Sequence, residues 1–491
     1  MLLKDLIVGV DSARILGDAK WETLNVTGLC DDSRFVKRGD LFFCRKGGNV
    51  DSHLYAKDAL KKGAVALVVE RELPFDVPQV LVDDSRSAIS LISVVFYGQP
   101  HTKLKLIGVT GTNGKTTTSY MLASILRTAG KSVGIIGTLG IYYENKKIAP
   151  ELTTPDPIFL QATLADMVAC GVEYAVMEVS AHALYYRKDA GVTYDACIFT
   201  NCTQDHLDFF QDMEEYAETK KTLFSRRKCR LAIVNGDDRL GREIAAARKS
   251  CGGDTLLYGL EEPADDFAVV TDEDLYGTDV VFNVRDELTH TRLSMAGKHN
   301  VYNALAAAVC AYEFGISLRD VSLGLKAVKR VNGRLELVAE TRGVKIFVDF
   351  AHTPDGLEKS LQALKRHCKG RLVCVFGCGG NRDKSKRPLM GETVAKNADF
   401  AVLTSDNPRY EDPLDIISDI ERGYRKHSTD FAIVPERERA VEYAISRAKD
   451  GDVLLIAGKG GEEYQEIMGI KYLLNDNDLI KKIIRESECS S

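Results

Sequence analysis

Short apolar segments alternate with helix-length segments in two successive blocks of this chain. The first block begins near Leu104 with LKLIGVTG and continues with SVGIIGT, EYAVMEV, ACIFT and LAIVNGDD. The second block contains VKIFVDF, LVCVFG, DFAVLTSD, FAIVP and DVLLIAG. Such alternation is typical of βαβ units, whose strands pair in parallel and are covered by helices. The pattern therefore predicts an α/β protein with two successive sheet-containing blocks.

Two regions depart from this alternation. The first hundred residues mix short strands and helices, and ALKKGAVALVVE (59–70) is predicted as the end of a helix followed by a buried strand. Antiparallel strands are expected between 266 and 295, and an alanine-rich helix is expected over 300–313. At roughly 150 residues per domain, the 491 residues predict three domains. We place them at 1–101, 102–332 and 333–491.

The composition disfavours several classes of protein. Lys and Arg number 65 and Asp and Glu 71, a net charge of −6, and basic blocks are absent, so a nucleic-acid partner is not expected. No apolar stretch approaches the ~18 residues of a membrane span. Asp11 and Arg14 fall where a signal peptide needs its apolar core. Cys374 and Cys378 lack the second pair that a zinc site requires. We expect a cytoplasmic protein with free thiols.

The segment GTNGKTTT, Gly111 to Thr118, lies between a predicted strand and a predicted helix. Glycine N–H groups at a helix N-terminus favour an anion, because the helix dipole and its unpaired donors point at it. Lys115 would reach the outer phosphates of a nucleotide, and the Thr116 hydroxyl would bind magnesium. The full phosphate-loop pattern has a glycine where this chain has Val109. We interpret the segment as a phosphate-binding loop rather than as a plain glycine turn.

Other polar residues follow predicted strands or share a helix. Glu178 ends EYAVME, where a carboxylate beside a phosphate loop favours metal binding. Asp205 and His206 in FTNCTQDHLDFF are candidates for a catalytic or binding site. It is equally expected that Asp205 caps a helix and that His206 is a structural loop residue. Asn300 and Asn303 share one helix face, where they would read an adenine edge or simply line the helix.

The last block contains three candidate ligand-binding turns. FGCGGNRDKSKRP (376–388) has Arg382 at the third glycine position of a dinucleotide fingerprint, and its cations suit an anionic ligand better. DNPRYEDP (406–413) is a turn from which Arg409 would project, suited to bidentate binding of a carboxylate. GKGGEEYQ (458–465) offers Glu462 and Glu463 to an ammonium group.

Together these motifs resemble those of the Mur ligases. VTGTNGKTTT, MEVSAHAL, FTNCTQDHLD, GKHNVYNALAA, NGRLE, VDFAHTPDGL, FGCGGNRDKSKRP, SDNPR and GKGGEEYQ occur in the order of that family. The resemblance covers essentially the whole chain. It is strongest to the UDP-N-acetylmuramoyl-tripeptide synthetase type that adds meso-diaminopimelate. The segment DDSRFVKRGDLFF (31–43) resembles the uridine-nucleotide domain of that type.

The resemblance implies ATP-dependent amide formation in peptidoglycan precursor synthesis. ATP would phosphorylate the D-glutamate carboxylate of UDP-N-acetylmuramoyl-L-alanyl-D-glutamate, and an amine of meso-diaminopimelate would expel phosphate. Such chemistry needs charge neutralisation around the phosphoryl group and close placement of the amine. The three domains would bind the UDP-substrate, ATP (a P-loop domain) and the incoming amino acid (a Rossmann-like domain). We expect a monomer whose C-terminal domain closes onto the ATP-binding domain.

Family roles transfer to residues that match the motifs. Catalytic roles fall on Lys115, Glu178, His206 and Lys220, the last as N6-carboxylysine, a carbamate whose oxygens suit magnesium. Mg²⁺ would be bound by Thr116, Glu178, His206 and Lys220. ATP contacts would be Gly111, Thr112, Asn113, Gly114, Lys115, Thr116, Thr117, Asn300, Asn303, Arg334 and Asp349. The UDP-muramoyl peptide would contact Ser33, Thr153, Thr154, Ser180 and either Arg187 or Lys188. Diaminopimelate would contact Arg382, Asp406, Asn407, Pro408, Arg409, Gly458 and Glu462.

This chain departs from the family pattern at two places, and other functions remain open. The usual arginine after SHAL aligns best with Lys188, and Gly461 replaces a usual histidine. A sister ligase adding L-lysine is the nearest alternative, but a buried Arg409 would then lack its carboxylate partner. A folylpolyglutamate-type synthetase would not need the N-terminal block. A P-loop ATPase switch is a distant alternative that would hydrolyse ATP without an amino acid.

Overall fold

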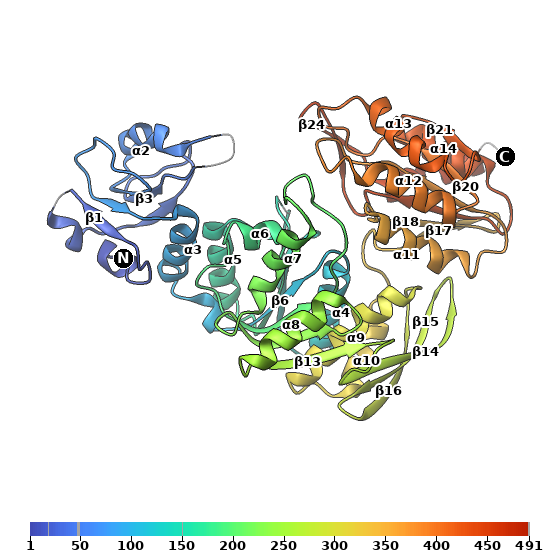
Figure 1. Cartoon of the computed structure of the whole chain (residues 1–491), viewed down its shortest axis with the longest axis horizontal. Helices are drawn as coiled ribbons and strands as arrows, with labels where there is room; N and C mark the ends of the chain where they lie inside the picture. The colour runs from blue at the N-terminus through green and yellow to red at the C-terminus, as the bar shows by residue number, and fades with distance from the viewer. Residues whose placement is uncertain (18, 47–49, 150, 490–491) are drawn as a thin grey trace. The chain divides into compact units, whose positions relative to one another are not determined.

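The computed structural model describes residues 1–17, 19–46, 50–149 and 151–489 (Figure 1). Strands in these ranges form sheets of five, eleven, six and two strands. The chain separates into two compact units, Met1–Gly108 with Ser132–Cys197 and Thr222–Arg230, and Val109–Lys131 with Ile198–Lys221 and Leu231–Ser491. None of the described helices is long and apolar enough to cross a membrane.

The N-terminal sheet has an apolar core on each face. Leu41 and Phe43 belong to the core that also contains Ile92, whereas Phe42 between them packs in the core that contains Ala59. Successive side chains of a strand point to opposite faces, so this burial fixes the register of β3. The order is β1-β5-β4-β3-β2, and only β1 pairs antiparallel. The elements are α1 (Leu3–Leu6), β1 (Arg14–Leu16), η1 (Ala19–Thr23), β2 (Gly28–Cys30), β3 (Asp40–Phe43), η2 (Ser52–Tyr55), α2 (Ala56–Lys62), β4 (Ala66–Val69), β5 (Gln79–Leu81), α3 (Ser85–Phe96) and η3 (Pro100–Thr102).

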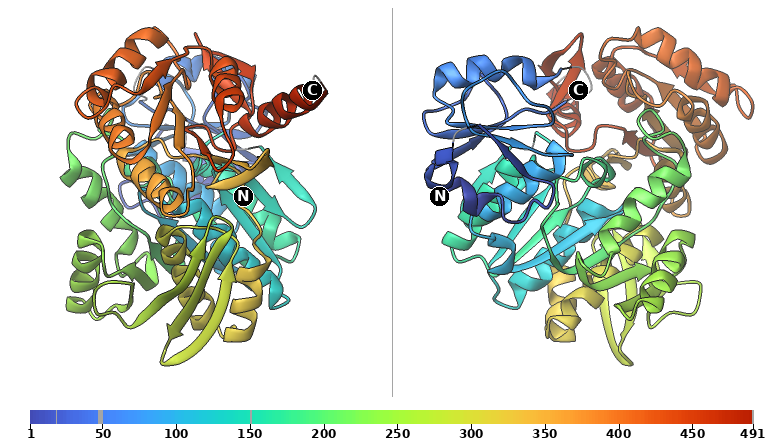
Figure 2. Two further views of the ribbon diagram at one scale, coloured as in Figure 1. Left: turned by 90° about the vertical axis from the view of Figure 1, so that its right-hand side faces the viewer. Right: turned by 60° about the vertical axis from the view of Figure 1, so that its left-hand side comes forward.

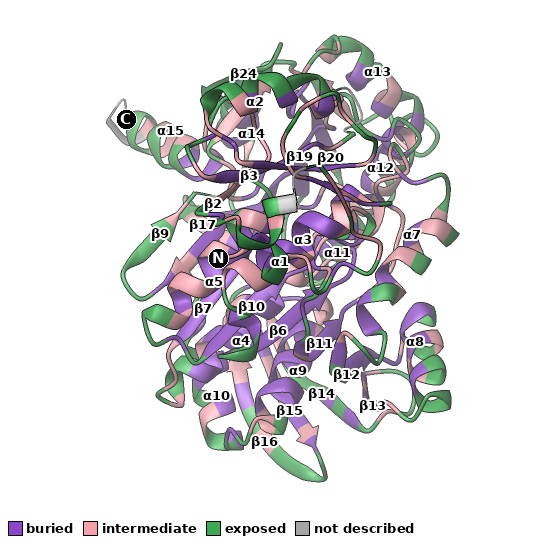
Figure 3. Cartoon of the chain, turned by 90° about the vertical axis from the view of Figure 1, so that its left-hand side faces the viewer, coloured by how far each residue is buried: buried purple, intermediate pink, exposed green. Residues whose placement is uncertain are grey.

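The eleven-stranded sheet has the order β16-β15-β14-β13-β12-β11-β6-β10-β7-β8-β9. Its strands β6, β7, β10 and β11 are buried along most of their length (Figure 3). Both ends of the sheet are antiparallel, at β14–β16 and at β7–β9. The strands are β6 (Lys105–Thr110), β7 (Val133–Gly137), β8 (Gly140–Tyr143), β9 (Lys146–Ile148), β10 (Tyr174–Glu178), β11 (Tyr194–Phe199), β12 (Cys229–Asn235), β13 (Asp254–Gly259), β14 (Asp266–Asp274), β15 (Gly277–Val284) and β16 (Glu287–Leu293). The helices are α4 (Lys115–Thr128), α5 (Pro157–Ala169), α6 (Ala181–Tyr185), α7 (Met213–Lys221), η4 (Thr222–Phe224), α8 (Arg239–Ser250), α9 (Lys298–Glu313) and α10 (Leu318–Ala327).

The C-terminal sheet has helices on both faces (Figure 2). Phe376 of β19 packs in the core with α11, α12 and α13, whereas its neighbour Val375 packs in the core with α14. The order is β17-β18-β22-β19-β20-β21, parallel except for β17–β18. The strands are β17 (Glu336–Thr341), β18 (Val344–Asp349), β19 (Leu372–Phe376), β20 (Phe400–Leu403), β21 (Phe431–Ile433), β22 (Val453–Ala457), and the separate hairpin β23 (Tyr464–Ile467) and β24 (Ile470–Leu473). The helices are α11 (Pro354–Lys365), α12 (Lys386–Asn397), α13 (Pro413–Tyr424), α14 (Arg437–Arg447) and α15 (Asp476–Cys489).

The predicted α/β fold is confirmed, including the antiparallel strands after residue 266 and the alanine-rich helix α9. Strands β8, β9, β13, β17, β23 and β24 were not predicted. β9 and β17 lie at sheet edges, β23 and β24 form a separate hairpin, and most residues of these four strands are partly or fully exposed, whereas β8 and β13 lie inside the eleven-stranded sheet. An exposed edge needs no continuous apolar run, so its sequence carries a weak signal.

Candidate active site

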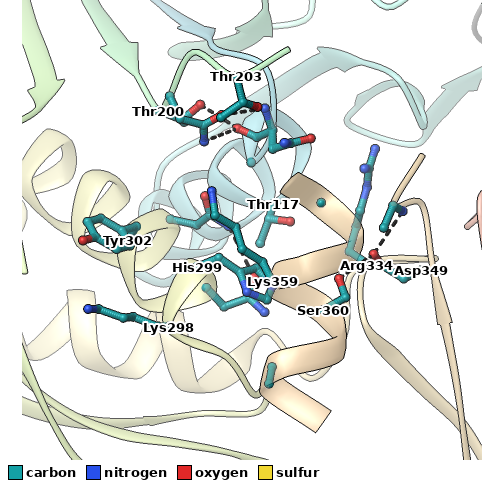
Figure 4. Close-up of a pocket in the computed structure, with 18 of the residues that line it drawn as sticks. Thr117, Thr200, Thr203, Lys298, His299, Tyr302, Arg334, Asp349, Lys359 and Ser360 are labelled. Carbon is teal, nitrogen blue, oxygen red and sulfur yellow. Dashed lines mark hydrogen bonds between the residues drawn. The ribbon is translucent and has the colours of Figure 1, made fainter. Parts of the chain in front are cut away.

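The phosphate-loop segment forms the start of α4 and one wall of a cavity of about 400 Å³ (Figure 4). Gly114 has φ +90°, and a methyl group added there would lie 2.3 Å from Asn303 Oδ1, so only glycine fits. Lys115 folds back, donating from Nζ to the carbonyls of Gly111 and Thr112 at 2.9 Å each. Of the predicted ATP contacts, the cavity is lined by Asn113, Gly114, Thr117, Asn300, Asn303, Arg334 and Asp349.

The two predicted asparagines of α9 face this loop. Asn303 Oδ1 accepts from the Thr118 hydroxyl at 3.2 Å, and Asn303 Nδ2 donates to Asn300 Oδ1 at 3.3 Å. Asn300 Nδ2 in turn donates to the Ala296 carbonyl at 2.8 Å. The shared helix face predicted for this pair is confirmed, and both residues lie at the cavity.

Arg334 and Asp349 reach the same cavity from the C-terminal sheet (Figure 4). Arg334 stacks on Phe350, 4.3 Å from the ring centre, and donates from Nη2 to the Thr116 hydroxyl at 3.0 Å. The Asp349 carboxylate accepts from the backbone N–H groups of Leu335 and Ala351 and from the Ser360 hydroxyl. A carboxylate has about four acceptor positions, so Asp349 keeps room for about one more donor.

Lys220 is buried at the end of α7, and its Nζ lies 4.1 Å from the centre of the Tyr216 ring. Burial, followed by the charge of Lys115, lowers the pKa of the Lys220 amine to about 7. A neutral amine is the form that reacts with CO₂, so this environment suits a carbamate.

His206 and Asp205 occupy the loop between β11 and α7, and Asp205 is no helix cap because α7 begins only at Met213. The Asp205 carboxylate lies 3.1 Å from Lys386 Nζ, 3.4 Å from His206 Nε2 and 3.5 Å from His352 Nε2. Burial alone would raise the pKa of this carboxyl, but the hydrogen bond from His352 and the charge of Lys386 hold it well below its usual range. Asp205 is therefore an anion surrounded by three cationic or titratable side chains.

Glu178 lies in the other unit, buried at the carboxyl end of β10. Its two carboxylate oxygens accept from the backbone N–H and the hydroxyl of Thr138, at 3.0 and 2.9 Å. Thr138 also lies 3.1 Å from the Thr153 hydroxyl. Thr154 donates to the Glu178 carbonyl and accepts from the Ser180 N–H, each at 2.9 Å. Four predicted residues, Glu178, Thr153, Thr154 and Ser180, are thus brought together.

The side chains of Arg187 and Lys188 make different contacts. Arg187 is exposed and pairs with Asp84 at 3.1 Å beside α3. Lys188 is mostly buried and pairs at 2.9 Å with Asp156, close in sequence to Thr153 and Thr154. Ser33 lies two positions after Asp31, and Asp31 is close to Asp156. Burial raises the pKa of the Asp31 carboxyl group and the Asp156 carboxylate raises it further, although the charge of Arg45 lowers it. The geometry therefore associates Lys188, rather than Arg187, with the other predicted muramoyl-peptide residues.

The residues predicted to bind diaminopimelate also gather. Asn407 Nδ2 donates to Glu462 Oε2 at 2.9 Å, and Lys459 Nζ lies 3.1 Å from the same oxygen. A methyl group added at Gly458 would lie 2.4 Å from Asp406 Oδ2, and one at Gly380 would overlap the Pro408 carbonyl. Arg409 donates from Nη1 to the Gly380 carbonyl at 2.8 Å. Arg382 lies on the same glycine-rich loop as Gly380.

Several cavity-lining residues were not predicted from the sequence. His299 and Tyr302 belong to the GKHNVYN motif, from which only Asn300 and Asn303 were chosen. The motif therefore carried the signal for both residues. Tyr302 donates to Asp237 at 2.6 Å, and Lys359 pairs with Asp355 at 2.9 Å. Asp355 also accepts from Asn113 Nδ2 at 3.0 Å, a link between α11 and the phosphate loop that no sequence signal indicated.

Magnesium prefers oxygen ligands, and most of the residues proposed to bind it offer oxygen, with His206 adding a ring nitrogen. No group of three His, Cys, Asp or Glu side chains in the described ranges forms a ready-made cage. Mg²⁺ commonly takes one or two carboxylates together with phosphate oxygens and water, so such a cage is not needed. The Thr116 hydroxyl at the start of α4 and a Lys220 carbamate would supply oxygens of this kind.

Comparison with known proteins places these features in one family. Three family models match: "Mur ligase family, catalytic domain" at 25–93, "Mur ligase middle domain" at 109–311 and "Mur ligase, glutamate ligase domain" at 333–460. The UDP-N-acetylmuramoyl-L-alanyl-D-glutamate–2,6-diaminopimelate ligase of Caldanaerobacter subterraneus subsp. tengcongensis is 42% identical, over 99% of this chain and 100% of its own. A similarly named ligase 1 of Clostridium acetobutylicum is also 42% identical, over 96% and 99%.

Solved structures agree with this relationship. A UDP-N-acetylmuramoyl-L-alanyl-D-glutamate–2,6-diaminopimelate ligase superposes with a TM-score of 0.69 and 31% identity, covering 96% of this chain and 97% of that one. A folylpolyglutamate synthase of Mycobacterium tuberculosis shares only the fold, with a TM-score of 0.64 and 18% identity over 76% and 92%. The full-length identity, the three matching models and the ordered motifs lead to one conclusion: the chain belongs to the Mur ligase family.

Proposed function

We propose that this chain joins meso-2,6-diaminopimelate to the D-glutamate carboxyl group of UDP-N-acetylmuramoyl-L-alanyl-D-glutamate, converting ATP to ADP and phosphate in peptidoglycan precursor synthesis. Full-length identity of 42% to ligases of that name supports the reaction. The observation that carries the choice of amino acid is Arg409, whose guanidinium lies among the other proposed diaminopimelate residues.

The cavity at the start of α4 would hold ATP. Backbone N–H groups of the loop 111–117 would cradle the phosphates, and Lys115 would swing from its own loop carbonyls to the outer phosphates. Asn300 and Asn303 would contact the base, and Asp349 the ribose with its remaining acceptor position. Arg334 would place a charge beside Thr116.

Mg²⁺ would neutralise the phosphate charge during phosphoryl transfer. Its proposed ligands are Thr116, Glu178, His206 and Lys220 as a carbamate. Carbamylation turns the buried amine of Lys220 into an anion, which also offsets the repulsion that Lys115 exerts on it.

The two remaining substrates would use the other groups of residues. Ser33, Thr153, Thr154, Ser180 and Lys188 would bind the UDP-muramoyl peptide. Arg382, Asp406, Asn407, Pro408, Arg409, Gly458 and Glu462 would bind diaminopimelate. Charge-assisted bonds from Arg409 to the distal carboxylate would orient the amine for attack on the acyl phosphate. We further propose domains at 1–101, 102–332 and 333–491 and a monomer that works in the cytoplasm.

Product analysis tests this proposal. The purified chain is incubated with ATP, Mg²⁺ and the UDP-muramoyl dipeptide, with and without meso-diaminopimelate. We expect phosphate release to require both the dipeptide and diaminopimelate, and the UDP-linked product to gain one diaminopimelate residue by mass. Phosphate release without any amino acid, or no mass gain, would refute the proposal.

A further inference from the structure

The hairpin β23–β24 supports the loop that carries Arg409. The Arg409 N–H donates to the Glu466 carbonyl at 3.1 Å, and the Met468 N–H donates to the Arg409 carbonyl at 2.7 Å. Gln465 Nε2 donates to the Asp406 carbonyl at 2.6 Å, and the Glu466 N–H donates to Asn407 Oδ1 at 2.9 Å. The loop therefore lies beside β23, to which it is joined by a single isolated parallel bridge between Arg409 and Ile467.

Arg409 needs this support because its backbone is in the left-handed region, with φ +52°. A non-glycine residue there costs of order 1 kcal/mol, which neighbouring contacts must offset. The two main-chain bonds to the hairpin supply such contacts. Glu466 thus fixes the backbone of Arg409 through its own carbonyl group.

Glu466 also contacts the Arg409 side chain. Its Oε2 lies 3.3 Å from Arg409 Nε, and the exposed fractions of the two side chains are only 24% and 21%. The Gly380 carbonyl accepts from Nη1. A guanidinium has five N–H donors, so about four make no hydrogen bond within the described part of the chain. The guanidinium is held on its Nε and Nη1 atoms and can still bind a carboxylate.

The side chain of a second arginine borders the same loop. A methyl group added at Gly379 would lie 2.9 Å from Arg409 Nη1 and 3.6 Å from Arg382 Cγ, so both arginines border the same glycine. The nearest carboxylate to Arg382 is Asp208, at 3.7 Å. Like charges in one region repel each other, and each of these arginines is paired with a carboxylate of its own. Glu466 is the carboxylate paired with Arg409.

We propose that Glu466 is the positioning residue of Arg409: through its main chain and its carboxylate it holds the guanidinium so that the remaining N–H donors meet the distal carboxylate of the amino-acid substrate. This inference rests on the proposed diaminopimelate-adding function and deepens it. A carboxylate that merely competed with substrate for Arg409 would have the opposite effect, because its removal would strengthen substrate binding.

Kinetics of variants at position 466 test the inference. Glu466→Ala removes the carboxylate that pairs with Arg409, and we expect the KM for meso-diaminopimelate to rise about tenfold, an effect between those of losing an exposed and a buried ion pair. The KM values for ATP and for the UDP-muramoyl dipeptide should stay within about twofold, since no proposed contact of either substrate lies on this hairpin. Glu466→Gln keeps the shape of the side chain but removes the charge that pairs with Arg409 Nε, and should resemble Glu466→Ala. Glu466→Asp keeps the charge, one methylene further away, and should restore part of the affinity.

Glu438→Ala is the matched control, because Glu438 is an exposed glutamate on α14 of the same sheet-containing block and has no proposed substrate contact. It should behave as wild type. An unchanged or lowered diaminopimelate KM in Glu466→Ala would overturn the inference, and so would equal KM values for the Asp and Ala variants. If Glu466→Ala fails to fold, the Gln and Asp variants decide alone, with Gln expected to have the higher diaminopimelate KM. A wild-type enzyme that never uses diaminopimelate would instead refute the proposed function.

Discussion

The buried carboxylate of Asp205 accepts a hydrogen bond from Lys386 Nζ at 3.1 Å, although 181 positions separate the two residues in the chain. Asp205 precedes His206 in the loop after β11, and Lys386 begins α12 directly after the loop that carries Arg382. Gln204 Nε2 adds contacts to Asp383 and Ser385 at 3.5 and 3.3 Å. The loop proposed for metal binding is therefore joined to the loop proposed for the amino acid.

Replacing Lys386 should test how much the Asp205–Lys386 contact contributes to stability and activity. Lys386→Met leaves Asp205 buried without its closest cation, and removing one partner of a buried pair costs about 3–5 kcal/mol. We expect the midpoint of urea unfolding to fall and kcat to drop with it. Lys396→Met on the same helix is the control, because its pair with Glu392 is at the surface and is worth at most about 1 kcal/mol. Equal losses of urea midpoint and kcat in the two variants would show that the Asp205–Lys386 pair contributes no more than a surface ion pair.

Gly114 should be indispensable for ATP binding. An alanine methyl at Gly114 would clash with Asn303 Oδ1, so we expect Gly114→Ala to raise the KM for ATP at least about tenfold. Gly130 at the other end of α4 also has positive φ, but a methyl group there meets nothing within 4 Å. Gly130→Ala therefore carries the same backbone penalty without the clash, and its ATP KM should stay near wild type. Similar ATP KM values in both variants would mean that the contact with Asn303 is unimportant.

Carbamylation of Lys220 should depend on pH and CO₂. Because the amine pKa is lowered to about 7, the amine loses its proton as pH rises through 7, and only the neutral form reacts with CO₂. For enzyme stripped of CO₂, the initial rate of reactivation at fixed dissolved CO₂ should be about tenfold higher at pH 8 than at pH 6. Lys221→Ala is the control, since Lys221 pairs with Glu218 and Glu243 at the surface. A reactivation rate independent of pH would contradict the lowered pKa.

Arg409 should decide which amino acid is used. Arg409→Ala removes the proposed partner of the distal carboxylate, and we expect kcat/KM for meso-diaminopimelate to fall by roughly 10²–10⁴. The KM for ATP should change little. Isothermal titration with ATP and steady-state kinetics with diaminopimelate separate the two effects. Equal losses for both substrates would contradict the assignment of Arg409.

The sequence predicted what depends on local pattern. Both sheets of the alternating blocks were predicted because strands such as VKIFVDF are buried on both faces, and Gly114 and Lys115 were found because the phosphate loop is contiguous. Contacts between segments distant in the chain could not be predicted from the sequence. Asp205 and Lys386 carry no mutual signal, and the hairpin of Glu466 is too exposed to show an apolar pattern. The sequence favoured Lys188 over Arg187 by alignment alone, and their different partners, Asp156 and Asp84, add a structural reason.

The most direct test of the account is phosphate release from ATP with the UDP-muramoyl dipeptide, comparing meso-diaminopimelate with L-lysine. L-lysine lacks the carboxylate that Arg409 is proposed to bind, so its use would leave that guanidinium without a ligand. The account predicts release with meso-diaminopimelate and little or none with L-lysine. Release with L-lysine alone would contradict the role of Arg409, and release without any amino acid would contradict the ligase reaction itself.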